Sequence, residues 1–209
     1  MKLSAHTIKT SCALASVLFA MPAVCDEGQA STEFSAEVGL GAEYDSNVTI
    51  DELDASSSES DYSLNMDVEL QLDHQFNDTA NVVATYNFSQ SNYDQFSFLD
   101  RQTHLLGLDL GTSFRKINSG LSLYYINARL DGSAFLKYYR ASPYLSGFLA
   151  KKWFARGAYV YSDKTIEQNQ GRDAQSHAGE LDLYYFRRGL RSYFNFGYKY
   201  KDEDAIEDR

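Results

Sequence analysis

Charged side chains at every second position of several segments are the residues of this chain that could act together chemically. The set comprises Glu37, Glu43, Asp67, Glu69, Asp109, Arg140, Arg156, Glu180, Asp182 and Lys199. If these segments enclose a narrow interior, the acids and bases at these positions would pair with one another. In a wide interior they would line a water-filled channel whose acidic side favours cations. The chemistry we expect is therefore ion pairing or selective passage.

Three histidines, His74, His104 and His177, are the candidates for acid–base catalysis. His104 and His177 begin expected strands near one rim, and His74 lies beside Asp73. A Ser-His-Asp or Asp-His site is conceivable there. However, none of the three lies in a recognisable motif, and no serine lies on a nucleophile elbow. We expect no catalytic residues and no enzyme. The alternative is a lipid-modifying barrel enzyme, which needs His104 or His177 within hydrogen-bond reach of an acid or a serine.

The segment 45–61 carries six acidic residues and no basic one. Carboxylates at this density can hold Ca²⁺. The candidate ligands are Asp45, Asn47 and Asp51, and the spacing of Asp45, Asn47 and Thr49 matches the opening of an EF-hand loop. Ile50 stands where that loop needs glycine, and Ser56 stands where it needs glutamate. We therefore expect no metal and no cofactor, and we interpret the segment as a solvated loop facing anionic lipopolysaccharide.

Alternation of apolar and polar residues must position these side chains. From Glu33 to Tyr44 every even position is apolar, and the same holds from Tyr62 to Leu72. Since successive side chains of a strand point to opposite faces, each segment has one apolar and one polar face. Strands are predicted at 33–44, 61–73, 80–90, 104–114, 120–129, 138–149, 153–162, 176–185 and 191–201. The apolar positions expected to face lipid include Leu64, Met66, Val68, Leu70, Leu106, Leu108, Leu110, Phe194, Phe196 and Tyr198.

The lengths of these segments and of their connections favour a membrane barrel. A strand of about 9–11 tilted residues crosses a bilayer. Long and short connections alternate, and aromatic residues gather at strand ends, which is typical of outer-membrane barrels. The segment 120–129 is ambiguous, with apolar residues on both faces, and a bulge there is an option. A soluble β-sandwich is the alternative fold, but its strands would be shorter and its loops richer in proline.

The fold class we predict is an all-β, antiparallel, up-and-down transmembrane β-barrel. Residues 1–25 are expected to be an export signal: Lys2 and Lys9 precede a short apolar stretch, and small residues precede Asp26. Residues 26–32 would be a short periplasmic N-terminus and residues 33–209 the barrel. The location is then the outer membrane of a Gram-negative bacterium, in contact with its lipids and lipopolysaccharide.

Composition excludes several other classes of function. Both cysteines lie in the expected signal, so the mature chain would have no disulfide, thiolate metal site or cysteine nucleophile. Without Lys2 and Lys9, 17 of the 19 basic residues remain against 29 acidic ones, a net charge of −12. An acidic chain disfavours nucleic-acid binding.

The number of predicted strands is odd, whereas bacterial single-chain barrels have an even number. An unclosed sheet would expose unpaired backbone groups to lipid. We therefore expect this chain to be the N-terminal part of a larger barrel. The alternatives are a miscounted strand, most readily at 120–129, or a partner chain that closes the ring.

The start of the expected barrel resembles a known family. A glycine-rich strand ends in Tyr44-Asp45-Ser46-Asn47-Val48, and an acidic loop and a long alternating strand follow. This arrangement resembles the outer-membrane barrel of the surface lipoprotein assembly modifier family. The resemblance implies a barrel of about fourteen strands that moves surface lipoproteins across the outer membrane. Family members proper carry a helical-repeat periplasmic domain before the barrel, and here only 27–32 separate the signal from the first strand.

The function expected from these observations is passage or surface export of a substrate across the outer membrane, with exported lipoproteins as partners implied by the resemblance. A passive porin-like channel is the first alternative and predicts ion conductance. A structural barrel with a filled lumen is the second and predicts none.

Overall fold

The computed structural model describes residues 9–21, 30–50, 55–56, 59–167, 170–187 and 192–205. Nine long strands follow one another from Ser31 to Ala205, and a tenth, β1, lies at the N-terminal edge. The strands are β1 (Lys9–Met21), β2 (Ser31–Asp45), β5 (Asp61–Asn77), β6 (Ala80–Tyr93), β7 (Arg101–Phe114), β8 (Ile117–Leu130), β9 (Ser133–Ala150), β10 (Trp153–Ile166), β11 (Ala174–Arg187) and β12 (Ser192–Ala205).

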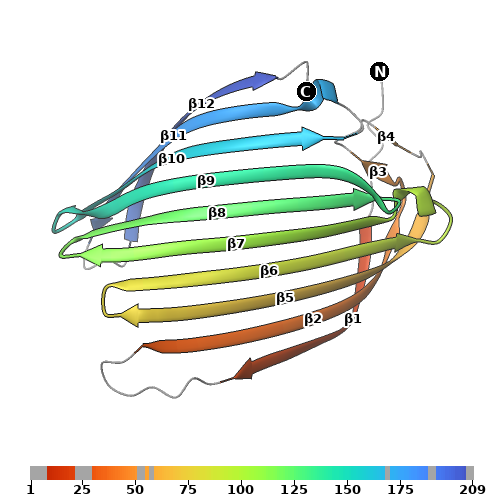
Figure 1. Ribbon diagram of the computed structural model, residues 1–209, viewed down its shortest axis with the longest axis horizontal. Coiled ribbons are helices and arrows are strands. Elements are labelled where there is room, and N and C mark those ends of the chain that lie inside the picture. The colour runs from red at the N-terminus through yellow and green to blue at the C-terminus, as the bar shows by residue number, and fades with distance from the viewer. Residues whose placement is uncertain are drawn as a thin grey trace.

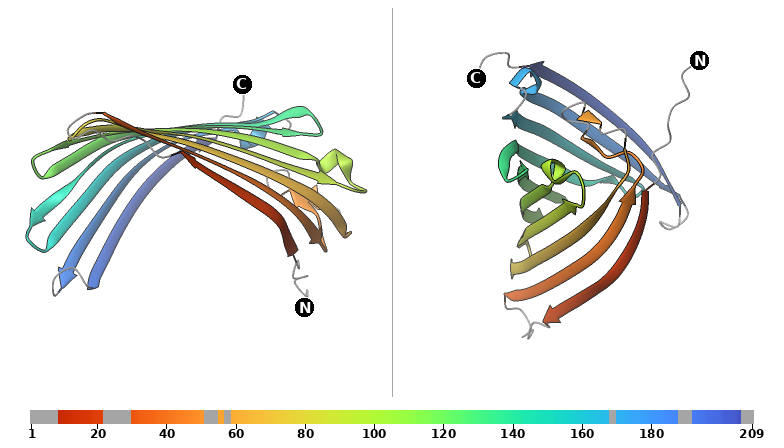
Figure 2. Two further views of the ribbon diagram at one scale, coloured as in Figure 1. Left: turned by 90° about the horizontal axis from the view of Figure 1, so that it is seen from below. Right: turned by 90° about the vertical axis from the view of Figure 1, so that its right-hand side faces the viewer.

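The long strands form one antiparallel, up-and-down sheet in which sequence neighbours are also spatial neighbours (Figure 1). The sheet is strongly curved, with one convex and one concave face (Figure 2). Within the described residues it is open: β1 and β12 are its two edges and do not pair with each other. The all-β, up-and-down architecture expected from the sequence is confirmed. The described residues do not form a closed barrel.

Short elements lie in the connections at one end of the sheet. The two-stranded hairpin of β3 (Thr49–Ile50) and β4 (Ala55–Ser56) follows β2. The 3₁₀ turn η2 (Ser97–Leu99) joins β6 to β7, and η3 (Gln170–Arg172) joins β10 to β11. We call this end the long-loop end and the other the short-turn end. Within the described residues, no helix has the length and apolar character needed to span a membrane.

The strands extend further than the sequence pattern indicated, because backbone pairing continues past the last apolar residue. The predicted loop 163–173 shortens to 167–173, since β10 runs on to Ile166. The predicted loop 91–101 shortens to 94–100, and β12 continues to Ala205 where an acidic loop was expected. The turn expected at 116–119 lies at 115–116. Half of the tight turn expected at 186–189 lies outside the described residues, and β11 itself runs to Arg187.

The connection from β8 to β9 is a two-residue turn of Asp131 and Gly132, not the loop expected at 131–134. Both residues have positive φ, 48° and 70°, which is the backbone that a tight hairpin with right-handed strand twist requires. The register steps from Ala128 opposite Leu136 to Arg129 opposite Ala134, so the extra residue, Phe135, belongs to β9, and the bulge considered for 120–129 does not lie in β8. The alternation of long and short loops is therefore broken at this one place.

Residues 9–21 form strand β1, which pairs with β2 along its whole length, from Lys9 opposite Asp45 to Met21 opposite Phe34. The sequence predicts an export signal over the same residues. The two assignments differ in whether this segment stays with the mature protein, so the signal remains a prediction.

A small apolar core lies at the long-loop end. Val48, Leu99, Ala128, Leu130, Phe135 and Ile166 are buried and packed together. Val48 and Leu99 come from the loops after β2 and β6, while the others come from β8, β9 and β10. The cluster therefore ties the long loops to the concave side of the sheet.

Candidate functional site on the concave face

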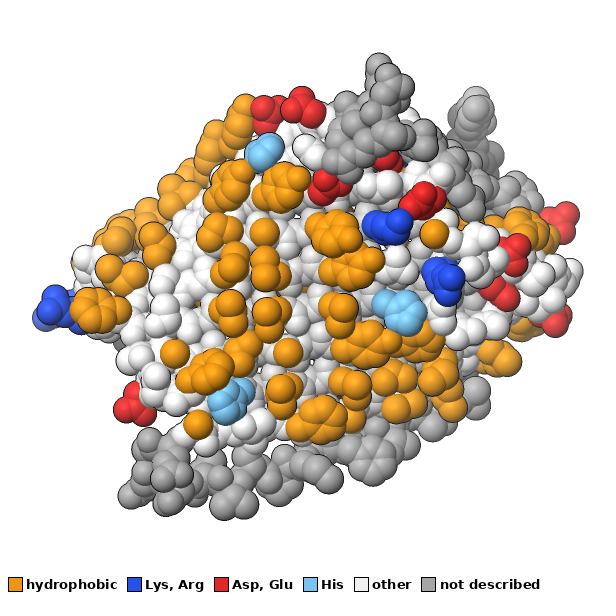
Figure 3. Space-filling model, viewed as in Figure 1, with side chains coloured by type: hydrophobic (Ala, Val, Ile, Leu, Met, Phe, Trp, Pro, Cys, Tyr) orange, Lys and Arg blue, Asp and Glu red, His pale blue; other side chains and the backbone are white. Residues whose placement is uncertain are grey.

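The pairing register separates apolar from charged side chains across the whole sheet. Directly opposed residues in antiparallel strands share a face, so each row can be followed from strand to strand. One such row joins Val38, Val68 and Phe88, and another joins Leu108, Leu123 and Ala141. The same register places Arg156 opposite Asp182, and Glu180 opposite Lys199, on the other face. Hydrophobic side chains cover the convex face in columns that run across the strands (Figure 3).

The convex face leaves large apolar side chains open to the surroundings. Leu64 is 67% exposed, Leu145 61% and Phe196 67%. Of the residues predicted to face lipid, Met66, Leu106, Leu110, Phe194 and Tyr198 are also exposed, while Val68, Leu70 and Leu108 are partly buried between their neighbours. No second layer of described residues covers the row from Leu64 to Leu72. Exposed apolar surface on this scale marks a surface that meets a partner or a membrane.

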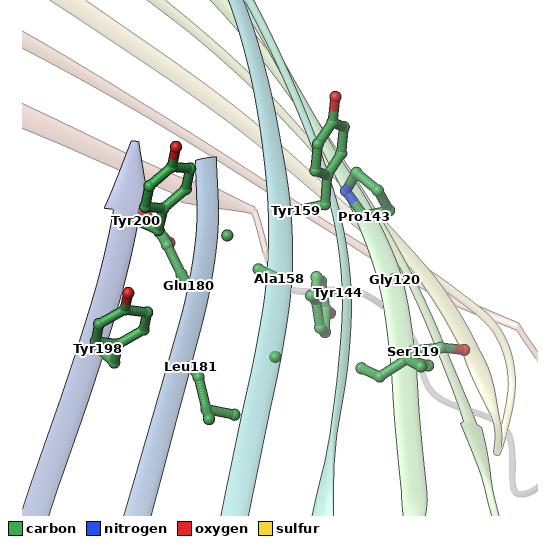
Figure 4. Close-up of a pocket in the computed structure, with 13 residues that line it drawn as sticks. Ser119, Gly120, Pro143, Tyr144, Ala158, Tyr159, Glu180, Leu181, Tyr198 and Tyr200 are labelled. Atoms are coloured by element: carbon green, nitrogen blue, oxygen red, sulfur yellow. The ribbon is translucent and has the colours of Figure 1, made fainter. Parts of the chain in front are cut away.

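Part of this face is hollowed into an apolar groove of about 780 Å³ over β8 to β12. Figure 4 shows Tyr198 and Tyr200 on one side of the groove and Tyr159 and Pro143 on the other. Gly157 and Gly179 form its floor, and a Cβ added to either would meet no atom within 4 Å. The groove therefore arises where two neighbouring strands carry no side chain.

The concave face is acidic over β2, β5 and β7. Glu37 lies directly opposite Glu69, and Gly39 directly opposite Asp67. Glu43 accepts a hydrogen bond from Asn65 at 3.3 Å, and Asp109 accepts one from the Tyr124 hydroxyl at 3.2 Å. Like charges in direct opposition repel unless water or a cation lies between them. This part of the face therefore favours positive charge in the space that it borders.

The concave face carries both signs of charge over β9 to β12. Lys199 forms an ion pair with Glu180 at 2.8 Å, and Arg156 lies 3.9 Å from Asp182. The guanidinium of Arg156 also lies over the ring of Tyr144, 5.3 Å from its centroid. Arg140 occupies the same face, opposite Tyr124 and Ser162. The structure thus brings all ten charged residues predicted from the sequence onto one face, with acids alone on one half and bases concentrated on the other.

Sequence reasoning missed Lys164 on this face, whereas the alternation in 191–201 already predicted Lys201 there. Lys164 was expected in a loop, but β10 reaches beyond it and its position in the alternation places it on the concave face. Lys201 lies on the same face, opposite Ala178. Extending the period of two through 163–166 would have found Lys164.

Aromatic side chains close the concave face near the short-turn end. Phe148, Phe154, Tyr184 and Phe186 form a chain of ring contacts with centroid distances of 5.3–6.4 Å. Over β9 to β11 the charged residues therefore lie between these rings and the apolar core at the long-loop end.

The three histidines lie on the convex face and pair with hydroxyl groups. His74 contacts the Thr32 hydroxyl and His104 the Tyr86 hydroxyl, each at 2.8 Å. His177 is hydrogen bonded to the Tyr159 hydroxyl. The three histidines are therefore hydrogen bonded to threonine and tyrosine hydroxyls. The enzyme alternative requires an acid or a serine at His104 or His177.

The candidate calcium ligands are used otherwise or lie outside the described residues. The carboxylate of Asp45, 3% exposed, accepts a hydrogen bond from the backbone N–H of Asn47 at 3.0 Å. Asp51 falls outside the described part of the chain. Among the described residues, no group of three or more His, Cys, Asp or Glu side chains is arranged to hold a metal ion.

Comparison of the chain with protein-family models, with curated proteins and with solved structures finds no match, so its function is inferred from the geometry of this face.

Proposed function

We propose that this sheet is part of an outer-membrane β-barrel through which a substrate passes, with its convex face toward lipid and its concave face lining the interior. The observation that carries the proposal is the division of the sheet into an exposed apolar face and a charged face. In water such an apolar face is costly, at about 25 cal/mol per Å² left exposed. In a bilayer it is stabilising, while the concave charges keep contact with water.

The strand lengths support the same proposal. Most strands have 14 residues and β9 has 18. At about 3.3 Å per residue, a 14-residue strand is roughly 46 Å long, and a tilt of about 45° reduces its span to roughly 33 Å. This span exceeds the apolar band of about 25 Å of a membrane barrel. The central residues of each strand would then lie in hydrocarbon and the ends in the interfacial regions.

Closure of the sheet belongs to the proposal. The outer edges of β1 and β12 present backbone N–H and C=O groups that lipid cannot satisfy. We propose that further strands, of this protein or of a partner chain, pair with the free edges. The resemblance to the surface lipoprotein assembly modifier family supports a ring of about fourteen strands and a lipoprotein substrate.

A passive channel is the second candidate, and the opposed charges of the concave face favour it. An acidic wall over β2 to β7 would concentrate cations in a wide interior. Planar-bilayer recordings on the full-length protein distinguish the two: steady, cation-selective conductance supports the channel. Absence of conductance in the bilayer, together with loss of surface lipoproteins in cells that lack the protein, supports export.

The barrel itself is tested by migration on a gel after refolding into detergent or lipid vesicles. We expect the unheated protein to migrate differently from the boiled protein, because a closed, fully hydrogen-bonded barrel resists detergent at room temperature. A boiled sample serves as the unfolded reference. Identical migration before and after boiling, in every lipid tried, would contradict a barrel.

The export signal is tested by the mass of the protein isolated from outer membranes. We expect the N-terminus to be Asp26, because the small residues at 23–25 offer a cleavage site. In that case β2 becomes the edge of the sheet and its outer backbone groups must pair with another strand. Recovery of a chain that begins at Met1 or Lys2 would show that β1 is a permanent strand.

A further inference from the structure

A second hollow in the sheet lies on its concave face, over β9 to β12 and towards the long-loop end. It is a pocket of about 210 Å³ that none of the preceding functions requires. Small side chains form its floor, among them Ser162, Ser176 and Ala178. Four cations border it: Arg140, Lys164, Lys199 and Lys201.

The register explains why these four side chains meet. Arg140, Ser162 and Ser176 form one row across β9, β10 and β11, and Ala178 lies opposite Lys201 in the next row. The backbones of β9 and β12 are separated by three strand spacings, about 14 Å on a flat sheet. Curvature shortens this distance on the concave side. Long cationic side chains on the two outer strands therefore lean over a floor of small residues from opposite sides.

The pocket has an excess of positive charge in a chain whose net charge is −10. Lys199 pairs with Glu180, and Lys201 with Glu203, so two carboxylates stand against four cations. The nearby pair of Arg156 and Asp182 is neutral in sum. An excess of two positive charges is left, carried by Arg140 and Lys164.

Polar groups in the pocket are available to a ligand. The Nε atom of Arg140 is buried and has no hydrogen-bond partner in the described part of the structure. The hydroxyls of Ser162 and Ser176 are hydrogen bonded to each other at 2.7 Å, so the hydroxyl that accepts in this pair keeps its own O–H free to donate to a ligand. A buried guanidinium nitrogen without a partner is costly until an acceptor reaches it.

We propose that this pocket binds a phosphate group. A phosphate monoester carries about −1.5 to −2 charges at pH 7, close to the excess of the pocket, and three acceptor oxygens. Arginine binds phosphate through paired N–H donors, and lysine adds point charges. The phosphate comes either from a soluble ester or from a lipid headgroup. The site depends only on β9 to β12 and holds whether or not a substrate passes through the barrel.

The test is calorimetric titration of the full-length protein in a maltoside detergent, which contains no phosphate, at constant ionic strength set with chloride. Inorganic phosphate and glucose 1-phosphate are the soluble probes. Micelles doped with phosphatidic acid, compared with phosphatidylcholine, represent the lipid source. We expect saturable binding of one phosphate per chain. Arg140→Gln should weaken it by about tenfold or more, since hydrogen bonds to a charged group are lost.

Lys152→Gln is the matched control, because it removes one positive charge from the exposed turn between β9 and β10 at the other end of the sheet. It should bind as the wild type does. Lys164→Gln is the second test variant if Arg140→Gln does not fold. Competition by phosphatidic acid identifies a lipid source, and binding of the soluble probes alone identifies a soluble one. Absence of saturable binding, or equal loss in the control, would overturn the proposal, while migration on a gel reports separately on the barrel.

Discussion

Leu106→Arg is expected to destabilise the protein folded in lipid vesicles, so that the variant folds only at much lower urea than the wild type. Leu106 lies near the middle of β7 on the convex face and is 50% exposed. An arginine on the lipid face near the bilayer midplane costs about 2–4 kcal/mol. In a water-soluble protein the same change at an exposed leucine would be close to neutral. The two environments therefore predict clearly different outcomes for one substitution.

The measurement is the fraction of chain that becomes heat-modifiable after refolding into phosphatidylcholine vesicles at increasing urea. Ser89→Arg is the matched control, since Ser89 lies on the concave face opposite Asp67, where a cation gains a partner. We expect the control to fold at wild-type urea concentrations and Leu106→Arg to need a far lower one. Equal folding of both variants would place the convex face in water.

The alternation of apolar and polar residues predicted the nine strands because each face of most strands has a uniform environment along its length. In β5 the environment on each side stays constant from Tyr62 to Leu72, so the alternation is unbroken. In β8 it changes along the strand, since the concave side passes beneath the apolar core that includes Ala128 and Leu130. The concave side is apolar from Tyr124 to Leu130 and the convex side from Leu121 to Tyr125. Apolar residues therefore lie on both faces at 123–126, which is why the sequence pattern was ambiguous there.

The loops could not be predicted in the same way, because their structure depends on contacts between distant segments. The segment after Asp45 was interpreted as solvated, yet Val48 is 1% exposed and belongs to the apolar core. The pocket cations were only partly found, since Lys164 looked like part of a polar loop. A local pattern gives the face on which a residue lies, while register and curvature decide which residues meet on that face.

Asp61→Ala is expected to release the loop between β6 and β7. The side chain of Asp61 is 1% exposed at the start of β5. Its Oδ2 accepts hydrogen bonds from the backbone N–H groups of Gln95 and Phe96, both at 3.0 Å, and its Oδ1 accepts one from Tyr62 at 2.8 Å. Alanine would leave these donors without an acceptor. Because each unsatisfied donor costs about 1–3 kcal/mol, we expect about 3–5 kcal/mol less local stability.

The loss should be local because Phe96 packs against the apolar core at the long-loop end and the strands themselves keep their pairing. Amide hydrogen exchange at Gln95 and Phe96 and chymotrypsin cleavage in 94–100 should both accelerate, while migration on a gel stays that of the folded sheet. Asp61→Asn keeps one acceptor oxygen and should give an intermediate effect. Asp78→Ala, in the exposed turn between β5 and β6, removes the same charge and should change neither rate. Unchanged protection in Asp61→Ala would mean that the apolar core alone holds the loop. In that case the buried Asp61 carboxylate would destabilise the fold, and only a further role at the long-loop end would explain its presence.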